Sequence, residues 1–288
     1  MALETIVLGI DGLEYSLVEK WDLKNLMQKK YGKLDLSDYS VIVTPPIWGS
    51  MITGKIDKEI IKLWEKTASI VGFQGDVKQK KSAKISLKIF SMLPVSLQSW
   101  LIGNVFTNLE DKNVFDVTAN YVKDKNLDNI FQFFKNPWTN GIPSYGRNIY
   151  SKNKRKMMHK AASGEKGPIK NITIEEFKKD KTELFSAIKN PEIDFIFWYT
   201  TLLDTLGHLY INKEIDMLNY YMEINSLAGE IKKNKPSANI FIISDHGMKT
   251  STERWGVHSK YAFFSSSTGE LISKPFDLFK LIKKYSTV

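Results

Sequence analysis

The sequence predicts an α/β fold with a mostly parallel central sheet, helices on both faces and an inserted basic cap. Three observations predict it: short apolar runs that stop at acidic or glycine-containing turns, helical stretches between them, and a lysine-rich middle. Of the 288 residues, 42% are hydrophobic, which supplies enough apolar surface for a buried core. A wholly disordered chain is therefore excluded.

The N-terminal part contains two predicted strands. Residues 5–10 are apolar and partly β-branched, and they end at Asp11 and a glycine, as a buried strand ends in a turn. A helix is expected over about 13–30. Residues 41–43 predict a second strand that must stop at Thr44, because two prolines follow and proline donates no ladder hydrogen bond. A helix is expected to follow, so Thr44 is predicted to lie at a strand-to-helix junction.

The C-terminal part repeats the alternation. A capping box of Thr173 and Glu176 predicts a helix that ends near residue 190. Apolar, aromatic-rich runs at 194–199 and 239–244 predict two buried strands, with a helix over about 213–233 between them. This βαβ order predicts a parallel sheet whose ligand site lies beyond the carboxyl ends of the strands.

The middle of the chain differs in pattern and charge. We predict a catalytic core formed by residues 1–54 and 171–288, and an inserted cap formed by residues 55–170. The cap range carries 21 basic and 10 acidic residues, so it accounts for the positive net charge of +9. Such a charge allows binding of nucleic acid or anionic lipid, and equally allows a solvated lysine surface. Residues 85–106 fit either the cap's core or an interfacial amphipathic helix.

Composition excludes several kinds of site. The sequence has no cysteine, so disulfides, thiolate nucleophiles and sulfur-bound zinc are impossible, and any metal is held by nitrogen and oxygen. No apolar run approaches the roughly 18 residues that a membrane span needs, and the N-terminus lacks the basic start of a signal peptide. We therefore expect no transmembrane segment and a cytoplasmic location.

Histidines and aspartates gather at the predicted strand ends. Three of the four histidines, His208, His246 and His258, lie in or near loops that follow strands. Asp204 precedes His208 by one helical turn, and Asp245 directly precedes His246. Each residue alone fits a helix cap or an exposed loop equally well. As a group they offer oxygen and nitrogen donors that suit zinc or manganese.

Seven positions are expected to project from one edge of the sheet: Asp11, Thr44, Asp204, His208, Asp245, His246 and His258. They comprise six nitrogen or oxygen ligands and one hydroxyl. Six ligands are enough for two cations that clamp the attacking and leaving oxygens of a displacement reaction.

These residues lie in motifs that resemble the alkaline phosphatase superfamily, in its type I phosphodiesterase and nucleotide pyrophosphatase branch. The matching segments, in chain order, are VLGIDG at 7–12, TPPIWGSMITG at 44–54, YTTLLDTLGH at 199–208, SDHGM at 244–248 and GVHSKYAFF at 256–264. SDHGM is the most specific of them. The resemblance implies an alkaline-phosphatase-like fold, and it covers less than half of the chain.

The resemblance also implies a set of roles. Asp11, Thr44, Asp245 and His246 would surround one divalent cation, and Asp204, His208 and His258 would hold the other. Zn²⁺ is the first expectation for both, and Mn²⁺ or another first-row dication is the alternative. Thr44 would attack phosphorus and form a phosphothreonine. The expected substrate is a phosphorylated small molecule or nucleotide with a diester or pyrophosphate linkage.

Several alternatives stay open at this level. A phosphomonoesterase, a phosphonate hydrolase or a phosphotransferase would use the same metal site, and a non-catalytic lysine-rich protein would bind anions or nucleic acid. The family's phosphate-contacting Asn has no counterpart near Thr44, where the next Asn is Asn104. Lys55, Trp48 and Arg254 are candidate substrate contacts, although Trp48 equally suits a packed core and the two basic residues suit a solvated surface.

Overall fold

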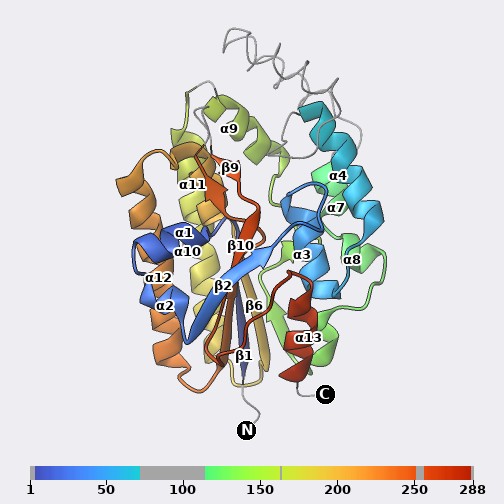
Figure 1. Ribbon diagram of the computed structural model, residues 1–288, viewed down its shortest axis with the longest axis vertical. Helices are drawn as coiled ribbons and strands as arrows, with labels where there is room; N and C mark the ends of the chain where they lie inside the picture. The colour runs from blue at the N-terminus through green and yellow to red at the C-terminus, as the bar shows by residue number, and fades with distance from the viewer. Residues whose placement is uncertain (1–3, 72–113, 163, 251–255, 287–288) are drawn as a thin grey trace.

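The computed structural model describes residues 4–71, 114–162, 164–250 and 256–286. They contain a six-stranded sheet of order β2-β10-β7-β1-β6-β3 (Figure 1). Its strands are β1 (Thr5–Ile10), β2 (Lys30–Asp35), β3 (Pro137–Thr139), β6 (Phe195–Thr200), β7 (Asn239–Ile243) and β10 (Tyr261–Ser266). β1 pairs in parallel with β6 and β7, and β3 with β6, whereas β10 runs antiparallel to β7 and β2. The predicted mostly parallel α/β sheet is confirmed.

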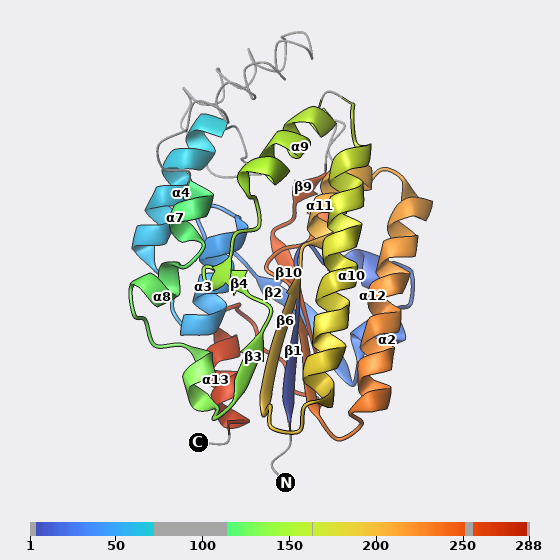
Figure 2. The same ribbon diagram turned by 180° about the vertical axis from the view of Figure 1, so that it is seen from behind.

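Helices cover both faces of this sheet (Figures 1 and 2). One face carries α3 (Thr44–Thr53), α4 (Lys58–Val71), α7 (Val114–Thr118), α8 (Tyr121–Asp124), the 3₁₀ helix η1 (Ile130–Phe133) and α13 (Asp277–Lys284). The other carries α1 (Tyr15–Lys20), α2 (Lys24–Met27), α10 (Gly167–Lys189), α11 (Leu202–Tyr210) and α12 (Glu214–Asn234). Strand residues alternate between the two cores, as Val7 and Leu8 do. The central strands are therefore apolar on both sides.

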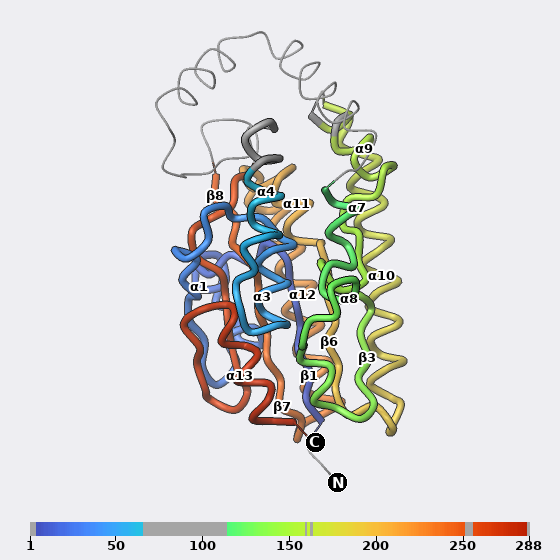
Figure 3. Tube along the Cα trace, turned by 90° about the vertical axis from the view of Figure 1, so that its right-hand side faces the viewer, coloured from blue at the N-terminus to red at the C-terminus, as the bar shows by residue number. Residues whose placement is uncertain are grey.

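The remaining elements are short or lie near the carboxyl ends of the strands. They are α9 (Lys152–Ala162), the pair β4 (Ile142–Pro143) and β5 (Gly146–Arg147), and the pair β8 (Met248–Lys249) and β9 (Val257–His258). Figure 3 shows α9 beyond the end of the sheet that is opposite the N-terminus. No helix among the described residues combines the length and apolar character that crossing a bilayer requires.

Helix α3 is the element that brings Thr44 to the sheet. Its residues are all buried, and the ring of Trp48 packs edge-on against Phe197 and Tyr199 of β6. Gly9 makes this approach possible, because a Cβ there would lie 2.9 Å from the Trp48 ring and 3.0 Å from Phe197. The packed helix directs its N-terminal residue, Thr44, to the carboxyl end of β1.

Two N-terminal predictions are wrong. Residues 41–43 form no strand, although Val41 and Val43 are buried in the core beside α3. The edge position next to β10 is taken by β2, at 30–35, so 41–43 have no strand to pair with. The single helix expected over 13–30 is replaced by α1 and α2, and positive φ angles at Asp22 (51°) and Gln28 (54°) interrupt the helical backbone.

The predicted C-terminal elements are found, with one shifted boundary. β6, α12 and β7 lie within one or two residues of the predicted ranges, and α10 ends at Lys189 as expected. α10 starts earlier, at Gly167, because Pro168 occupies its first turn, where proline is well accommodated. Thr173 therefore lies inside the helix and donates to the Ile169 carbonyl instead of capping an end.

The division into a core and an inserted cap stays a prediction. Within the range 55–170, the described residues include α8 and η1, which pack on the sheet's α3 side, and β3, which pairs with β6 at the edge of the central sheet. At least this part of the range is built into the sheet layer. The predicted amphipathic segment 85–106, and Asn104 within it, lie outside the described residues.

Candidate active site

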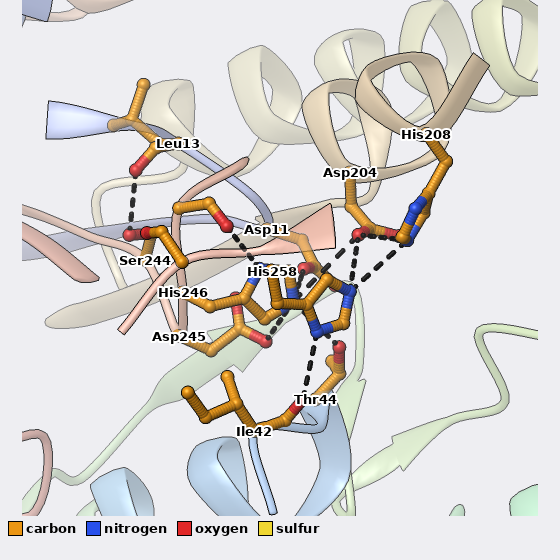
Figure 4. Close-up of polar contacts among 12 residues, drawn as sticks. Asp11, Leu13, Ile42, Thr44, Asp204, His208, Ser244, Asp245, His246 and His258 are labelled. Carbon is orange, nitrogen blue, oxygen red and sulfur yellow. Dashed lines mark hydrogen bonds and ion pairs between the residues drawn. The ribbon is translucent and has the colours of Figure 1, made fainter. Parts of the chain in front are cut away.

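The seven predicted site residues converge where the central parallel strands end (Figure 4). Because β1, β6 and β7 are adjacent and parallel, the loops that follow them meet at the same edge of the sheet. β1 is followed by the turn with Asp11, β6 by α11, and β7 by the Asp245-His246 pair. The start of α3 and the short strand β9 supply the other two residues, Thr44 and His258.

The close approach of two loops depends on a glycine. Gly12 has a φ of +74°, and a Cβ there would lie 2.7 Å from the Cα atom of Asp204. The turn after Asp11 can therefore touch the first turn of α11. On α11, Asp204 and His208 are four residues apart and share one face, so their Oδ1 and Nε2 atoms lie 3.2 Å apart.

The three histidines are oriented in the same way. Each Nδ1 atom faces a backbone carbonyl, which can only accept a hydrogen bond, so Nδ1 carries the proton. The acceptors are the carbonyl oxygens of Gly256 for His208 (2.8 Å), Ile42 for His258 (2.9 Å) and Gly247 for His246 (3.1 Å). In the neutral rings, Nε2 then carries no proton, and its lone pair is directed into the site. Metal-binding histidines are commonly oriented in this way.

One group of potential ligands surrounds Asp204 Oδ1. This oxygen lies 3.2 Å from His208 Nε2 and 3.6 Å from His258 Nε2, and the two nitrogens are 3.2 Å apart. Two unprotonated nitrogens at this distance repel each other unless a positive charge lies between them. Asp204, His208 and His258 thus have the spacing of a cation site, and their nitrogen and oxygen atoms are ligands that Zn²⁺ or Mn²⁺ accepts.

A second group surrounds His246 Nε2. This nitrogen lies 3.3 Å from Asp11 Oδ1, 3.4 Å from Asp245 Oδ2, 3.5 Å from Thr44 Oγ1 and 3.8 Å from Asp204 Oδ1. Asp11, Asp204 and His246 again satisfy the spacing of a cation site. Asp204 Oδ1 therefore lies between both groups, whereas the sequence motifs place it in only one.

Four carboxylate oxygens of this site lack hydrogen-bond partners among the described residues. Asp11 Oδ1, Asp204 Oδ1 and both oxygens of Asp245 are buried, and none of them has a hydrogen-bond partner in the described part of the chain. Burying a carboxylate oxygen without a hydrogen-bond partner lowers the stability of a folded protein by on the order of 1–3 kcal/mol, and by more when the group is charged. Coordination of divalent cations satisfies such oxygens, so the residues present fit the metal centre that the motifs imply.

The pKa values of the site residues reflect the burial of several acidic groups close together. Burial and the nearby charges of Asp245 and Asp204 raise the pKa of Asp11 well above its usual range, and burial raises the pKa of Asp245 to about 7. Burial also acts on Asp204, but the neighbouring histidines outweigh it and lower its pKa. Burial and His258 lower the pKa of His246, whereas the charge of Asp204 overcomes burial and raises the pKa of His208. The site holds more negative charge than its histidines balance.

Two tyrosines that the sequence analysis assigned no role hold the site carboxylates. Tyr199 donates to Asp11 Oδ2, and Tyr150 donates to Asp204 Oδ2 over 3.0 Å. Burial raises the pKa of both phenols well above the usual value, so both remain donors. Tyr199 starts the YTTLLDTLGH motif, which is a usable signal. Tyr150 lies 54 residues before Asp204 in no recognisable motif, and nothing in the sequence marks it.

The three predicted substrate contacts fare differently. Trp48 is fully buried between α3 and β6, so its ring serves the packing role that the sequence also allowed. Lys55 is exposed beyond the C-terminus of α3, roughly 16 Å along the helix from Thr44 at 1.5 Å per residue, and it does not join the site. Arg254 lies outside the described residues.

Comparison with known proteins identifies the family. The sequence model of the type I phosphodiesterase / nucleotide pyrophosphatase family matches residues 98–266. This span contains five of the seven site residues, Asp204, His208, Asp245, His246 and His258, and it starts after Asp11 and Thr44. No curated protein matches the sequence significantly.

Solved structures of low sequence identity were also found. Murine ectonucleotide pyrophosphatase / phosphodiesterase 5 matches with a TM-score of 0.41 and 12% identity over 87% of this chain and 59% of its own. Alkaline phosphatase from the Antarctic bacterium TAB5 matches with a TM-score of 0.41 and 12% identity over 98% of both chains. This chain thus covers less than two thirds of the murine protein. Because the family model matches more than half of the sequence, the chain belongs to the type I phosphodiesterase / nucleotide pyrophosphatase family.

Proposed function

We propose that this protein hydrolyses phosphoric ester bonds, with Thr44 as nucleophile and two bound divalent cations. The observation that carries the proposal is the group of four buried carboxylate oxygens without hydrogen-bond partners among the described residues, beside three Nε2 atoms and one hydroxyl. Membership of the phosphodiesterase family supports the ester class. Zn²⁺ or Mn²⁺ is the proposed metal, because all donors are nitrogen or oxygen.

The proposed ligands follow the two groups of the site. Asp11, Thr44, Asp245 and His246 hold one cation, and Asp204, His208 and His258 hold the other. Bound cations neutralise the charge that develops on the phosphoryl oxygens and lower the pKa of the nucleophile's hydroxyl. Asp204 Oδ1 lies near both groups, so its negative charge would stabilise a cation held by either one.

Thr44 is positioned for attack by helix α3. It is the first residue of the helix, after Val43 in an extended conformation, and the two prolines that follow fix the helical φ angle. The N-terminus of a helix carries a partial positive charge, which favours an anionic oxygen and a phosphate group. The N-terminus of α3 therefore helps to stabilise the negative charge that develops beside Thr44 in the transition state.

The proposed reaction has two displacements. Thr44 Oγ1 loses its proton and bonds to phosphorus, the bond from phosphorus to the leaving-group oxygen breaks, and that oxygen takes up a proton. Water then attacks the phosphothreonine, the bond from phosphorus to Oγ1 breaks, and Thr44 regains its hydroxyl proton. The products are an alcohol, or a phosphate if the linkage is a pyrophosphate, and a phosphate monoester.

The described arginines favour a diester over a monoester. Arg147 is paired with Asp180 over 2.6 Å, and Arg155 donates to the Tyr150 carbonyl and lies 3.6 Å from Asp116. Neither guanidinium presents its paired N–H donors to the site. A monoester has one more negative charge and is usually clamped by arginine, whereas a diester needs no such clamp. A monoesterase on the same metal pair is the alternative, and nucleotides are one candidate class of substrate.

The test compares bis-(4-nitrophenyl) phosphate with 4-nitrophenyl phosphate, each with added Zn²⁺ or Mn²⁺. We expect faster turnover of the diester and complete loss of turnover with a chelator. Thr44→Ala should lower kcat by a factor of about 10³ or more, whereas Thr182→Ala, on the exposed face of α10, should not change it. Full activity in Thr44→Ala would rule out the covalent route, and preference for the monoester would support the alternative.

A further inference from the structure

Each of two site carboxylates has one oxygen that accepts a hydrogen bond from a phenol and one oxygen without a hydrogen-bond partner among the described residues. Tyr199 donates to Asp11 Oδ2 and Tyr150 to Asp204 Oδ2, while Oδ1 of both aspartates is buried with no hydrogen-bond partner in the described residues. The same division occurs at two aspartates from different elements, the turn after β1 and helix α11. The oxygens without phenol partners are the ones that lie 3.2–3.8 Å from the histidine Nε2 atoms.

Tyr199 is held rigidly where it contacts Asp11. Its backbone N–H and carbonyl both bond the side-chain amide of Asn140 at 2.9 Å, so Asn140 continues the β3–β6 ladder by one step. Its ring packs edge-on against Trp48, and the guanidinium carbon of Arg147 lies over the ring, 5.5 Å from its centre. Arg147 is in turn fixed by the buried ion pair with Asp180. The direction of the hydroxyl is therefore set by three independent contacts.

Tyr150 reaches Asp204 from the segment between β5 and α9. Its ring packs edge-on against Phe115 of α7, with the centroids 5.1 Å apart. Its N–H donates to Asn148 Oδ1 over 3.1 Å, and its carbonyl accepts from Arg155 Nη1 over 2.6 Å. Residues 137–155 thus include Tyr150 and also supply Asn140 and Arg147, which contact Tyr199. This stretch provides none of the proposed metal ligands.

We propose that Tyr150 and Tyr199 are positioning residues that hold Asp204 and Asp11 in a one-oxygen mode of metal binding. By occupying Oδ2, each phenol leaves a single oxygen, Oδ1, for a cation and prevents the carboxylate from rotating into a two-oxygen mode. A neutral donor does this without adding charge to a site that already has excess negative charge. Partners of this kind typically change metal affinity by about 10- to 100-fold when they are removed. This inference rests on the proposed function.

The test uses Tyr150→Phe and Tyr199→Phe in the full chain, which remove only the hydroxyl. Tyr121→Phe is the matched control, because the Tyr121 hydroxyl also donates to a carboxylate over 3.0 Å, and that carboxylate, Asp57, is not one of the proposed metal ligands. Zn²⁺ affinity is measured by competition with a chromophoric chelator, and the visible spectrum of the Co²⁺-loaded protein reports the coordination number.

We expect each site variant to bind Zn²⁺ roughly 10- to 100-fold more weakly and to shift the Co²⁺ spectrum toward a higher coordination number, with Tyr121→Phe unchanged in both. Thermal unfolding of the chelated proteins checks folding, and if Tyr199→Phe does not fold, Tyr150→Phe alone decides. Wild-type affinity and spectrum in a folded variant would overturn the inference. If wild-type protein bound no Zn²⁺ or Co²⁺, the proposed function would fail first, which is a distinguishable result.

Discussion

The two halves of the site differ in charge and in exposure. We call Asp11, Asp245 and His246 the inner half, and Asp204, His208 and His258 the rim half. The inner half has two carboxylates for one imidazole and is completely buried, whereas the rim half has one carboxylate for two imidazoles, and the His258 side chain is 14% exposed. Accordingly, the pKa of both inner aspartates is raised and that of Asp204 is lowered. With neutral imidazoles, the inner half carries two negative charges for a bound cation to balance, whereas the rim half carries one.

The largest expected effect is on turnover when an inner carboxylate is neutralised. Asp245→Asn replaces a charged ligand by a weak neutral one in the fully buried half, and we expect kcat for the nitrophenyl diester to fall by about 10³-fold. Glu192→Gln, an exposed position before β6, is the matched loss of charge. Retention of more than a tenth of the wild-type rate would show that the inner half holds no essential cation.

A smaller and reversible loss is expected at the rim. His258→Gly removes one of three rim ligands at a position that solvent reaches, so we expect a decrease of roughly 10²-fold that added imidazole partly restores. The same imidazole concentration should not restore Asp245→Asn, because that position is closed. Equal rescue of both variants, or of neither, would contradict the difference in access between the halves.

The same Asp245→Asn variant should be more stable than wild type when both are chelated. The folded-state pKa of Asp245, about 7, lies above its unfolded value, so its contribution to stability is fully present below about pH 4 and is lost as pH rises through 7. Asn at this position cannot ionise, so the variant does not lose this stability at high pH. At pH 8 we expect its free energy of unfolding to exceed that of wild type by on the order of 3 kcal/mol. Urea unfolding with chelator at pH 5 and pH 8 checks it. A variant less stable than wild type at pH 8 would refute the charge argument.

The smallest expected effect separates packing from binding at Trp48. Trp48→Phe leaves a partly filled space against Phe197 and Tyr199, and we expect a loss of about 1–2 kcal/mol in unfolding free energy. KM for an aromatic diester should be unchanged, because the Trp48 ring is fully buried against Phe197 and Tyr199. A rise in KM of fivefold or more would restore the stacking role that the sequence also allowed.

The sequence was most informative where a short segment specifies its own structure. Apolar runs such as 240–243 have no polar face, so they are predicted as buried strands before any neighbour is known. The segment 41–43 has the same composition, yet β2 takes the edge beside β10. Strand pairing is a competition between distant segments, and local composition does not resolve it.

The ligand types could likewise be read from the chain, since most predicted ligands lie just after a strand or in the first turn of a helix, and His208 follows Asp204 by one helical turn. The geometry that makes them a site could not. Asp204 Oδ1 lies between both groups of ligands, Gly12 allows two loops to touch, and Tyr150 binds Asp204 across 54 residues. Such contacts depend on side-chain directions that only long-range packing of α3, α11 and the strand ends imposes, whereas the fold class and the chemistry of the donors follow from residue types and their periodicity.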